Sequence, residues 1–152
     1  RHFEKTNVND VVKITAQDLT AYATEFERDI EINVETDEDV PERILDPVQI
    51  RLALFNLGKN AVETLTQSET EAPRVTLSTH LASDREYVEI KVADNGPGIG
   101  EDIAQNLFIP FKTNKPGGTG LGLTITKKVI DSHHGTISCD TGKHGSVFTI
   151  TL

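Results

Sequence analysis

The chain has 152 residues, enough for one domain of ordinary size, and 36% of them are hydrophobic, enough to fill a single core. With 24 acidic residues against 15 basic ones, the formal net charge is −9, which argues against binding nucleic acid or an anionic membrane surface through clustered cations. The single cysteine, Cys139, excludes an intramolecular disulfide and a cysteine-rich zinc site and favours a reducing, cytoplasmic compartment. We expect Cys139 itself to be a small buried residue in a strand.

The first half of the chain predicts two helices, a strand and an N-terminal edge strand. Residues 8–26 place apolar side chains at spacings of three and four, which predicts a helix with Asn7 or Asn9 as its N-cap. Residues 31–36 alternate as in a half-buried strand, ended by an acidic loop at 37–41, and residues 2–6 suit an edge strand. Residues 47–65 predict a long amphipathic helix with Asp46 as its cap.

The second half mixes strands, glycine-rich loops and helices. The predicted strands are 74–81, 87–93, 136–140 and 146–152, with connections at 82–86 and 141–145. Residues 94–100 form a loop, 101–107 a short helix, 108–119 a segment without regular period, and 120–133 a helix with Gly135 as its C-cap. Three longer helices and about five strands predict an α+β fold. We expect a two-layer sandwich of a mixed, mostly antiparallel sheet with about three helices on one face.

Polar side chains gather on one side of the predicted helix at 47–65. At 100° per residue, Gln49, Asn56, Asn60 and Glu63 lie within about 60° of one another and away from the apolar stripe. That stripe consists of Ile50, Ala53, Leu54, Leu57, Ala61 and Leu65. Asparagine is a poor residue inside helices, so two of them at i and i+4 cost stability. Either this is a solvated surface or the amides serve a site.

Two glycine-rich segments follow. The first is D-N-G-P-G-I-G at 94–100, where a carboxylate at a strand end can accept a hydrogen bond from the exocyclic amine of adenine and glycines let the main chain approach a flat base. The second is K-P-G-G-T-G-L-G-L at 115–123, where backbone N–H groups and a helix N-terminus suit a di- or triphosphate. By themselves, these strings also occur in plain turns and capped connectors. The second fits neither the P-loop nor the Rossmann fingerprint.

Taken in order, these pieces resemble the ATP-binding domain of sensor histidine kinases, in the superfamily that also holds type II topoisomerases, heat-shock ATPase chaperones and mismatch-repair ATPases. The matching strings are NLGKNAVETL, DNGPGI, LFIPFKT and GGTGLGLTI, which span residues 56 to 125 in the family's order. The flanking elements fit the same fold, so the resemblance covers almost the whole chain. It implies the histidine kinase ATP-binding fold and a single catalytic domain over residues 1–152.

The resemblance also implies site residues. Asn60 and Asn56 would hold the Mg²⁺ that bridges the ATP phosphates, and Asp94 would accept the adenine amino group. Residues 108–119 would form an ATP lid anchored by Phe108 and Phe111, with Lys112 and Lys115 available for the γ-phosphate and Lys115 preferred. The remaining residues implied to contact ATP are Gly96, Gly98, Ile99, Gly118, Thr119, Gly120, Leu121 and Gly122. Asn56, Asn60 and Lys115 are the residues expected to take part in catalysis.

Two positions depart from common family patterns. Many members carry a basic residue where this chain has Glu63, which we interpret as the mark of a subfamily with short lids. Asn56 lies where the hydrolysing branches carry a glutamate that activates water. Without that carboxylate there is no evident general base, whereas a neutral imidazole nitrogen needs none to attack phosphorus. Asn56 therefore favours transfer to histidine over hydrolysis and over serine phosphorylation.

The phosphoacceptor itself is missing from the sequence. Kinases of this type carry it in an H-[ED] string on a helical hairpin, and no histidine of this chain has that context (His2, His80, His133, His134 and His144). The chain also has no methionine and no apolar stretch of about 15 residues that could act as a signal or span a bilayer. We expect a catalytic domain cut from a longer protein whose parent could be membrane-anchored.

The sequence thus predicts a protein histidine kinase domain that binds Mg·ATP and transfers the γ-phosphate to a histidine on a separate hairpin, for relay to a response-regulator aspartate. Its expected partners are ATP and ADP, that hairpin and, indirectly, the regulator. The chain alone is expected to be monomeric, without nucleic-acid or direct membrane contact. Two alternatives stay open: a non-catalytic nucleotide-sensing or scaffold module, which Glu63 would suit, and a serine kinase antagonising a sigma factor.

Overall fold

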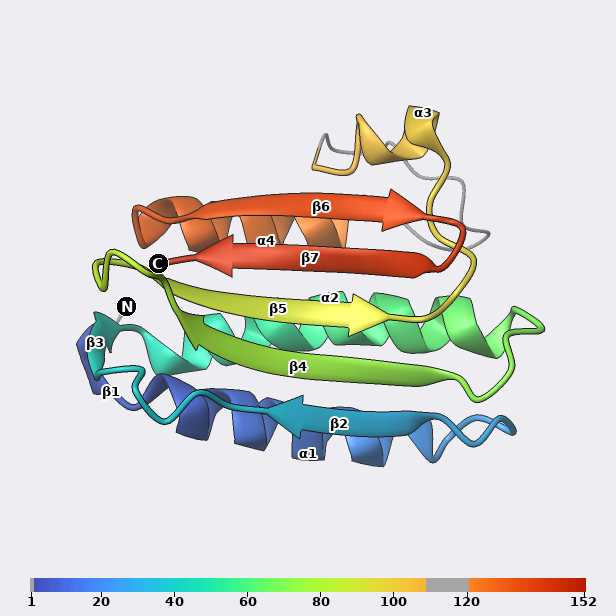
Figure 1. Cartoon of the computed structure of the whole chain (residues 1–152), viewed down its shortest axis with the longest axis horizontal. Helices are drawn as coiled ribbons and strands as arrows, with labels where there is room; N and C mark the ends of the chain where they lie inside the picture. Colours follow the sequence, from blue (N-terminus) through green and yellow to red (C-terminus); the bar gives the residue numbers. More distant parts are fainter. Residues whose placement is uncertain (1, 109–120) are drawn as a thin grey trace.

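A computed structural model describes residues 2–108 and 121–152 of the chain. In chain order its elements are β1 (Glu4–Thr6), α1 (Val8–Ala23), β2 (Glu31–Glu35), β3 (Arg43–Leu45), α2 (Pro47–Thr66), β4 (Arg74–Leu81), β5 (Val88–Asp94), α3 (Glu101–Ala104), α4 (Leu121–Ser132), β6 (Thr136–Gly142) and β7 (Gly145–Thr151). Figure 1 shows a sheet with the three longer helices behind it, α1 behind β2, α2 behind β4 and β5, and α4 behind β6 and β7. The predicted two-layer α+β sandwich is confirmed.

The main sheet has the strand order β2-β4-β5-β7-β6. β4, β5, β7 and β6 pair antiparallel, whereas β2 joins β4 in parallel through a connection that contains α2. The strands β1 and β3 form a separate antiparallel pair beside the N-terminal end of α2. This arrangement brings the end of β5 and the start of β7 together at one end of the sheet, the right-hand end in Figure 1.

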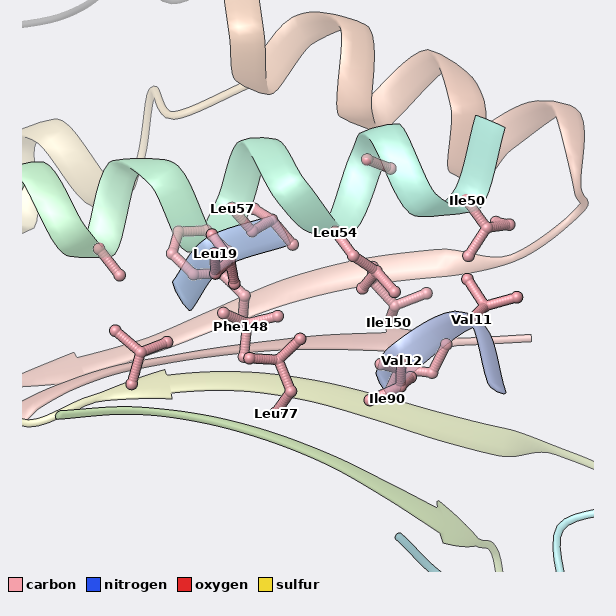
Figure 2. Packing of buried hydrophobic residues seen from close by; sticks show 14 of the residues in the cluster. Val11, Val12, Leu19, Ile50, Leu54, Leu57, Leu77, Ile90, Phe148 and Ile150 are labelled. Atoms are coloured by element: carbon pink, nitrogen blue, oxygen red, sulfur yellow. The ribbon is translucent and has the colours of Figure 1, made fainter. Parts of the chain in front are cut away.

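The hydrophobic core lies between the helix layer and one face of the sheet. Figure 2 shows Ile50, Leu54 and Leu57 of α2 pointing toward the strands, where Leu77, Ile90, Phe148 and Ile150 meet them. The whole predicted apolar stripe of α2 is buried, and so are Gly58 and Val62, which the helical periodicity had left out. A Cβ on Gly58 would overlap the side chain of Leu19, so this glycine lets α1 pack closely on α2.

Several element boundaries differ from the sequence-based expectation. The helix α1 ends at Ala23 and not at residue 26. Just after this end, the Thr24 hydroxyl donates to the Ala21 carbonyl and so competes with backbone N–H groups for that acceptor. The strand β3 was not predicted. Asn7 and Asp46 are the N-caps of α1 and α2, as expected, accepting the N–H groups of Asp10 and Gln49.

The end of α4 also differs from the prediction. His134, with φ 59°, takes the left-handed position that we assigned to Gly135. The N–H of Gly135 bonds to the Ile130 carbonyl and that of His134 to the Asp131 carbonyl, which is a Schellman motif. Gly135 is needed for another reason, because a Cβ there would lie 2.5 Å from the Thr151 carbonyl oxygen. In the part of the chain described here, no helix combines the length and apolar character needed to cross a membrane.

Candidate functional site

A row of four side chains crosses the sheet where β5 ends. In the strand register Asp94 pairs with Val75 on one side and with Ser146 on the other, and Ser146 pairs with Thr141 of β6. Side chains alternate along β5, and Val88, Ile90 and Val92 face the core. Asp94 continues that alternation, so its half-buried carboxylate lies on the side of the sheet that carries the helices.

Hydrogen bonds shape the loop that follows Asp94. The Asp94 Oδ1 accepts the N–H of Gly96 at 2.9 Å, and the Thr141 hydroxyl oxygen accepts the N–H of Ile99 at 2.7 Å. The hydroxyls of Thr141 and Ser146 are 3.0 Å apart and share a hydrogen bond. The loop that begins with the predicted adenine acceptor is therefore fastened to the β6–β7 hairpin.

Sequence reasoning gave neither Thr141 nor Ser146 a part in the site, because it placed Thr141 in a turn at 141–145 and Ser146 at the first position of the strand 146–152. In the structure β6 runs to Gly142 and β7 begins at Gly145, so the turn is only two residues long and both hydroxyls belong to paired strands. Ser146 is 3% exposed, unusual for a residue of its polarity. The signal that could have found them is the tight spacing T-G-x-x-G-S, which suits a two-residue hairpin.

The helix α2 forms the wall opposite this strand end. Asn56 and Asn60 are half-buried and one turn apart, and Asn60 takes part in interactions within the protein. Leu65, in the last turn of α2, lies 3.3 Å from the position that a Cβ of Gly96 would occupy. The same Cβ would be 3.0 Å from the Asp94 carboxylate. A side chain at position 96 would press on both Leu65 and the Asp94 carboxylate, so glycine lets the loop lie close against the end of α2.

Glu63 has a specific partner in the neighbouring helix. Its Oε2 accepts the hydroxyl of Tyr22 at 2.7 Å, and the ring of Tyr22 lies edge-on to Phe55 and within 6.0 Å of the Lys59 ammonium. Burial, followed by the bond to the Glu63 carboxylate, raises the pKa of Tyr22 above its ordinary value. The acidic residue near the asparagine pair is thus tied to α1 through one of its oxygens.

Phe108 contacts both the core and α4. The Phe108 ring lies edge-on to Phe148 with 6.5 Å between ring centroids, and the Thr124 hydroxyl is 3.4 Å from the Phe108 carbonyl oxygen. Phe108 therefore packs on the core, as its predicted anchoring role requires. The predicted residues Phe111, Lys112, Lys115, Gly118, Thr119 and Gly120 lie outside the described residues. Leu121 and Gly122 are the first residues of α4.

The donor set fits a magnesium nucleotide. Asparagine carbonyl oxygens are hard ligands of the kind Mg²⁺ prefers, and Mg²⁺ usually takes only one or two protein ligands beside phosphate oxygens and water. Within residues 2–108 and 121–152, no group of three or more histidine, cysteine, aspartate or glutamate side chains could hold a metal ion. The carboxylate of Asp94, which accepts the Gly96 N–H through Oδ1, is a group that can also accept a hydrogen bond from an exocyclic amine such as that of adenine.

Comparisons with known proteins agree with this geometry. The family model of the histidine kinase-, DNA gyrase B- and HSP90-like ATPases matches residues 45–152. The sensor protein TdiS of Thauera aromatica is 33% identical over 147 residues, 96% of this chain and 26% of that protein. The sensory histidine kinase/phosphatase NtrB of Vibrio alginolyticus is 33% identical over 136 residues, 84% of this chain and 38% of that protein. The chain spans well under half the length of both relatives.

Among solved structures, the catalytic domain of histidine kinase ThkA in a nucleotide-free form is similar over its whole extent. It is 28% identical, with a TM-score of 0.81, and the match covers 100% of this chain and 95% of that one. The family match includes α2, the end of β5 and the β6–β7 hairpin, the elements that build the site. The chain belongs to the histidine kinase-, DNA gyrase B- and HSP90-like ATPase family.

Proposed function

We propose that the chain binds Mg·ATP and transfers its γ-phosphate to a histidine on a separate helical hairpin of a two-component sensor kinase. The observation that carries this proposal is that the last turn of α2 reaches the Asp94–Gly96 end of β5 through Leu65, in a chain of this ATPase family whose α2 carries the asparagine pair. On this proposal the helix supplies ligands for Mg²⁺ and the strand end supplies an acceptor for adenine.

Each part of the nucleotide has a counterpart in this arrangement. Asp94 accepts the exocyclic amine, and Gly96, Gly98 and Ile99 form the floor under the base. Asn60 and Asn56 would hold the Mg²⁺, which would supply neutralisation of the phosphate charge. We expect Lys115, with Lys112 as the second cation, to bind the γ-phosphate, Phe111 to anchor the ATP lid, and Gly118, Thr119, Gly120, Leu121 and Gly122 to contact the nucleotide.

The domain's own contribution to the transfer is to position the groups. A neutral imidazole nitrogen of the hairpin attacks the γ-phosphorus, a P–N bond forms, the bond to the β-phosphate oxygen breaks, and ADP leaves. The imidazole lone pair needs no base beforehand, which suits a site where Asn56 stands in place of a carboxylate. Catalysis then depends on alignment and on charge neutralisation.

The partners follow from this chemistry. The phosphorylated hairpin would pass its phosphate to an aspartate of a response regulator. Histidine kinase ThkA has been solved in complex with the response regulator protein TrrA. We expect this chain by itself to be monomeric, to act in the cytoplasm where ATP and a reducing milieu are available, and to form one domain over residues 1–152.

The test mixes the purified chain with a hairpin from a sensor kinase of this family and γ-labelled ATP. We expect acid-labile, base-stable phosphate on the hairpin, which requires Mg²⁺. The variant Asn60→Ala should lose at least about tenfold in transfer because a Mg²⁺ ligand is gone. The matched control Asn33→Ala, on β2, should transfer like wild type.

Other outcomes separate the alternatives. Tight Mg·ATP binding without transfer to any hairpin would contradict the kinase proposal and favour the nucleotide-sensing module. Acid-stable phosphate on a serine of an added protein would favour the serine kinase. The variant Asp94→Asn tests the pocket under all three functions, and unchanged ATP affinity in it would mean that the base lies elsewhere.

A further inference from the structure

We infer that Asn95 is a positioning residue that sets the Asp94 carboxylate for adenine, although Asn95 itself does not touch the nucleotide. This inference rests on the proposed function, since it concerns how the same site distinguishes its base. It starts from the hydrogen bonds that the Asn95 side chain makes, all of which go to the backbone of a segment distant in sequence.

The Asn95 side chain continues the β4–β5 ladder beyond its last registered pair. That pair is Val75 with Asp94, so the next positions are Arg74 and Asn95. The Asn95 Oδ1 accepts the N–H of Arg74 at 2.8 Å, and the Nδ2 donates to the Ala72 carbonyl at 2.9 Å. The backbone N–H of Asn95 reaches the Arg74 carbonyl at 3.4 Å, near the limit for such a bond. The side-chain amide thus makes the donor and acceptor hydrogen bonds that a backbone peptide group makes between paired strands.

The segment that Asn95 holds is the connection from α2 to β4. At its other end the guanidinium of Arg28 donates to the carbonyls of Leu65, Ser68 and Thr70. Ala72 has φ 47°, a left-handed conformation that is rarely adopted by a residue with a Cβ and persists only where its surroundings impose it. The connection is therefore fixed from two sides, by Arg28 and by Asn95.

Holding this connection fixes how the loop after β5 lies against the end of α2. Leu65 in the last turn of α2 would be 3.3 Å from a Cβ of Gly96, and the Asp94 carboxylate 3.0 Å from it, so helix end, loop and carboxylate pack together. Asn95 is the residue between Asp94 and Gly96, so its side chain ties the loop to the chain leaving α2. If that tie is cut, the Asp94 carboxylate loses its fixed direction toward an amine, while Asn56 and Asn60, in the interior of the helix α2, keep theirs.

The experiment compares ATP with inosine triphosphate, which lacks the exocyclic amine, by calorimetric titration in Mg²⁺. We expect Asn95→Ala to weaken ATP binding about tenfold, because a misdirected Asp94 carboxylate would lose its hydrogen bond to the exocyclic amine. Binding of inosine triphosphate should change much less, so the affinity ratio falls. In the hairpin assay the KM for ATP should rise while kcat stays close to that of wild type.

Two further variants make the test specific. Asn95→Asp keeps the acceptor for Arg74 and loses the donor to Ala72, so we expect an intermediate ratio, which also serves if Asn95→Ala folds poorly. The matched control is Asn9→Ala: this half-buried asparagine also clamps a loop, with Nδ2 donating to the Asp37 carbonyl and Oδ1 accepting the Thr79 hydroxyl. Thr79 pairs with Ile90, several residues from Asp94. Losing the Asn9 amide should therefore lower stability without changing the ratio of the ATP and inosine triphosphate affinities.

An unchanged ratio in both Asn95 variants, or an equal loss for the two nucleotides, would overturn the role of Asn95. The same drop in ratio in Asn9→Ala would show a general loosening and would overturn it as well. A wild-type chain that binds neither nucleotide would instead remove the proposed function, and with it the role of Asn95.

Discussion

Gly98 and Gly145 determine how closely the loop after β5 approaches the β6–β7 hairpin. Gly98 has φ +83° and Gly145 φ +130°, conformations that side-chain-bearing residues rarely adopt. A Cβ on Gly98 would overlap the Gly142 carbonyl, and one on Gly145 would overlap the Asp94 carbonyl. Both obstacles are backbone atoms, which cannot turn away as a side chain would.

The substitution Gly98→Ala should therefore destabilise the chain by about 1–3 kcal/mol from backbone strain alone. The overlap with the Gly142 carbonyl adds to this cost. Gly100→Ala is the matched control, because a Cβ there meets nothing within 4 Å. Urea unfolding of the two variants measures the difference. Equal midpoints for both would contradict the close approach seen here.

The site was predictable to the extent that it depends on local motifs. Asp94, Gly96 and Asn60 follow from strings whose residue types suit a base and a cation. The hydroxyls of Thr141 and Ser146 could not be placed, because their nearness to Asp94 follows from the pairing of β5 with β7, a contact between segments about fifty residues apart. The tie between Tyr22 and Glu63 depends in the same way on how two helices pack.

At the scale of elements, α2 is held on both flanks. The helices α1 and α4 pack against it on opposite sides, and its N-terminus is capped by Asp46. The Asp46 N–H also donates to Nε2 of His133, the residue directly after α4, at 3.0 Å. The part-buried hydrogen bond from Tyr22 to Glu63 adds a polar tie between α1 and α2.

Removing this tie with Tyr22→Phe should lower stability at neutral pH by about 0.5–1.5 kcal/mol. The pKa of Tyr22 is raised in the folded chain, so the folded state holds this proton more tightly than the unfolded state does. Its contribution is therefore fully present below the unfolded pKa of about 10 and is lost as pH rises above that value. Unfolding titrations from pH 8 to 11 should show wild type and variant converging, and a constant difference would contradict the assignment.

Elements with strong periodicity were predicted, and short or context-dependent ones were not. The three longer helices and the strands of the main sheet repeat apolar residues at the right spacing over several turns or pleats. The three residues of β3 show no such pattern and are extended because β1 pairs with them. The left-handed residue after α4 is His134, although Gly135 follows it. Gly135 is needed at its own position because its backbone packs closely against the Thr151 carbonyl.

At the scale of the whole molecule, one hydrophobic core joins the helix layer to the sheet. Leu54 is 0% exposed and lies at its centre in Figure 2, whereas Leu52 on the same helix is 44% exposed. The two leucines have the same volume and the same helix propensity, so only burial distinguishes them.

Truncating Leu54 to alanine should cost about 2–5 kcal/mol, from lost burial and the cavity left behind. Leu52→Ala should remain within about 0.5 kcal/mol of wild type. Chemical denaturation of both variants gives the comparison, with equal slopes expected. A Leu52 variant as unstable as the Leu54 variant would show that α2 packs in another orientation.

In the described part of the chain the main sheet ends in two edge strands, β2 and β6. An edge strand offers unpaired backbone groups to which another chain can add, and charged side chains oppose this. The strand β2 carries Glu31 and Glu35, whereas β6 is seven residues long and carries only Asp140. The edge open to aggregation is therefore β6, and a lysine at the exposed position 138 would protect it most directly.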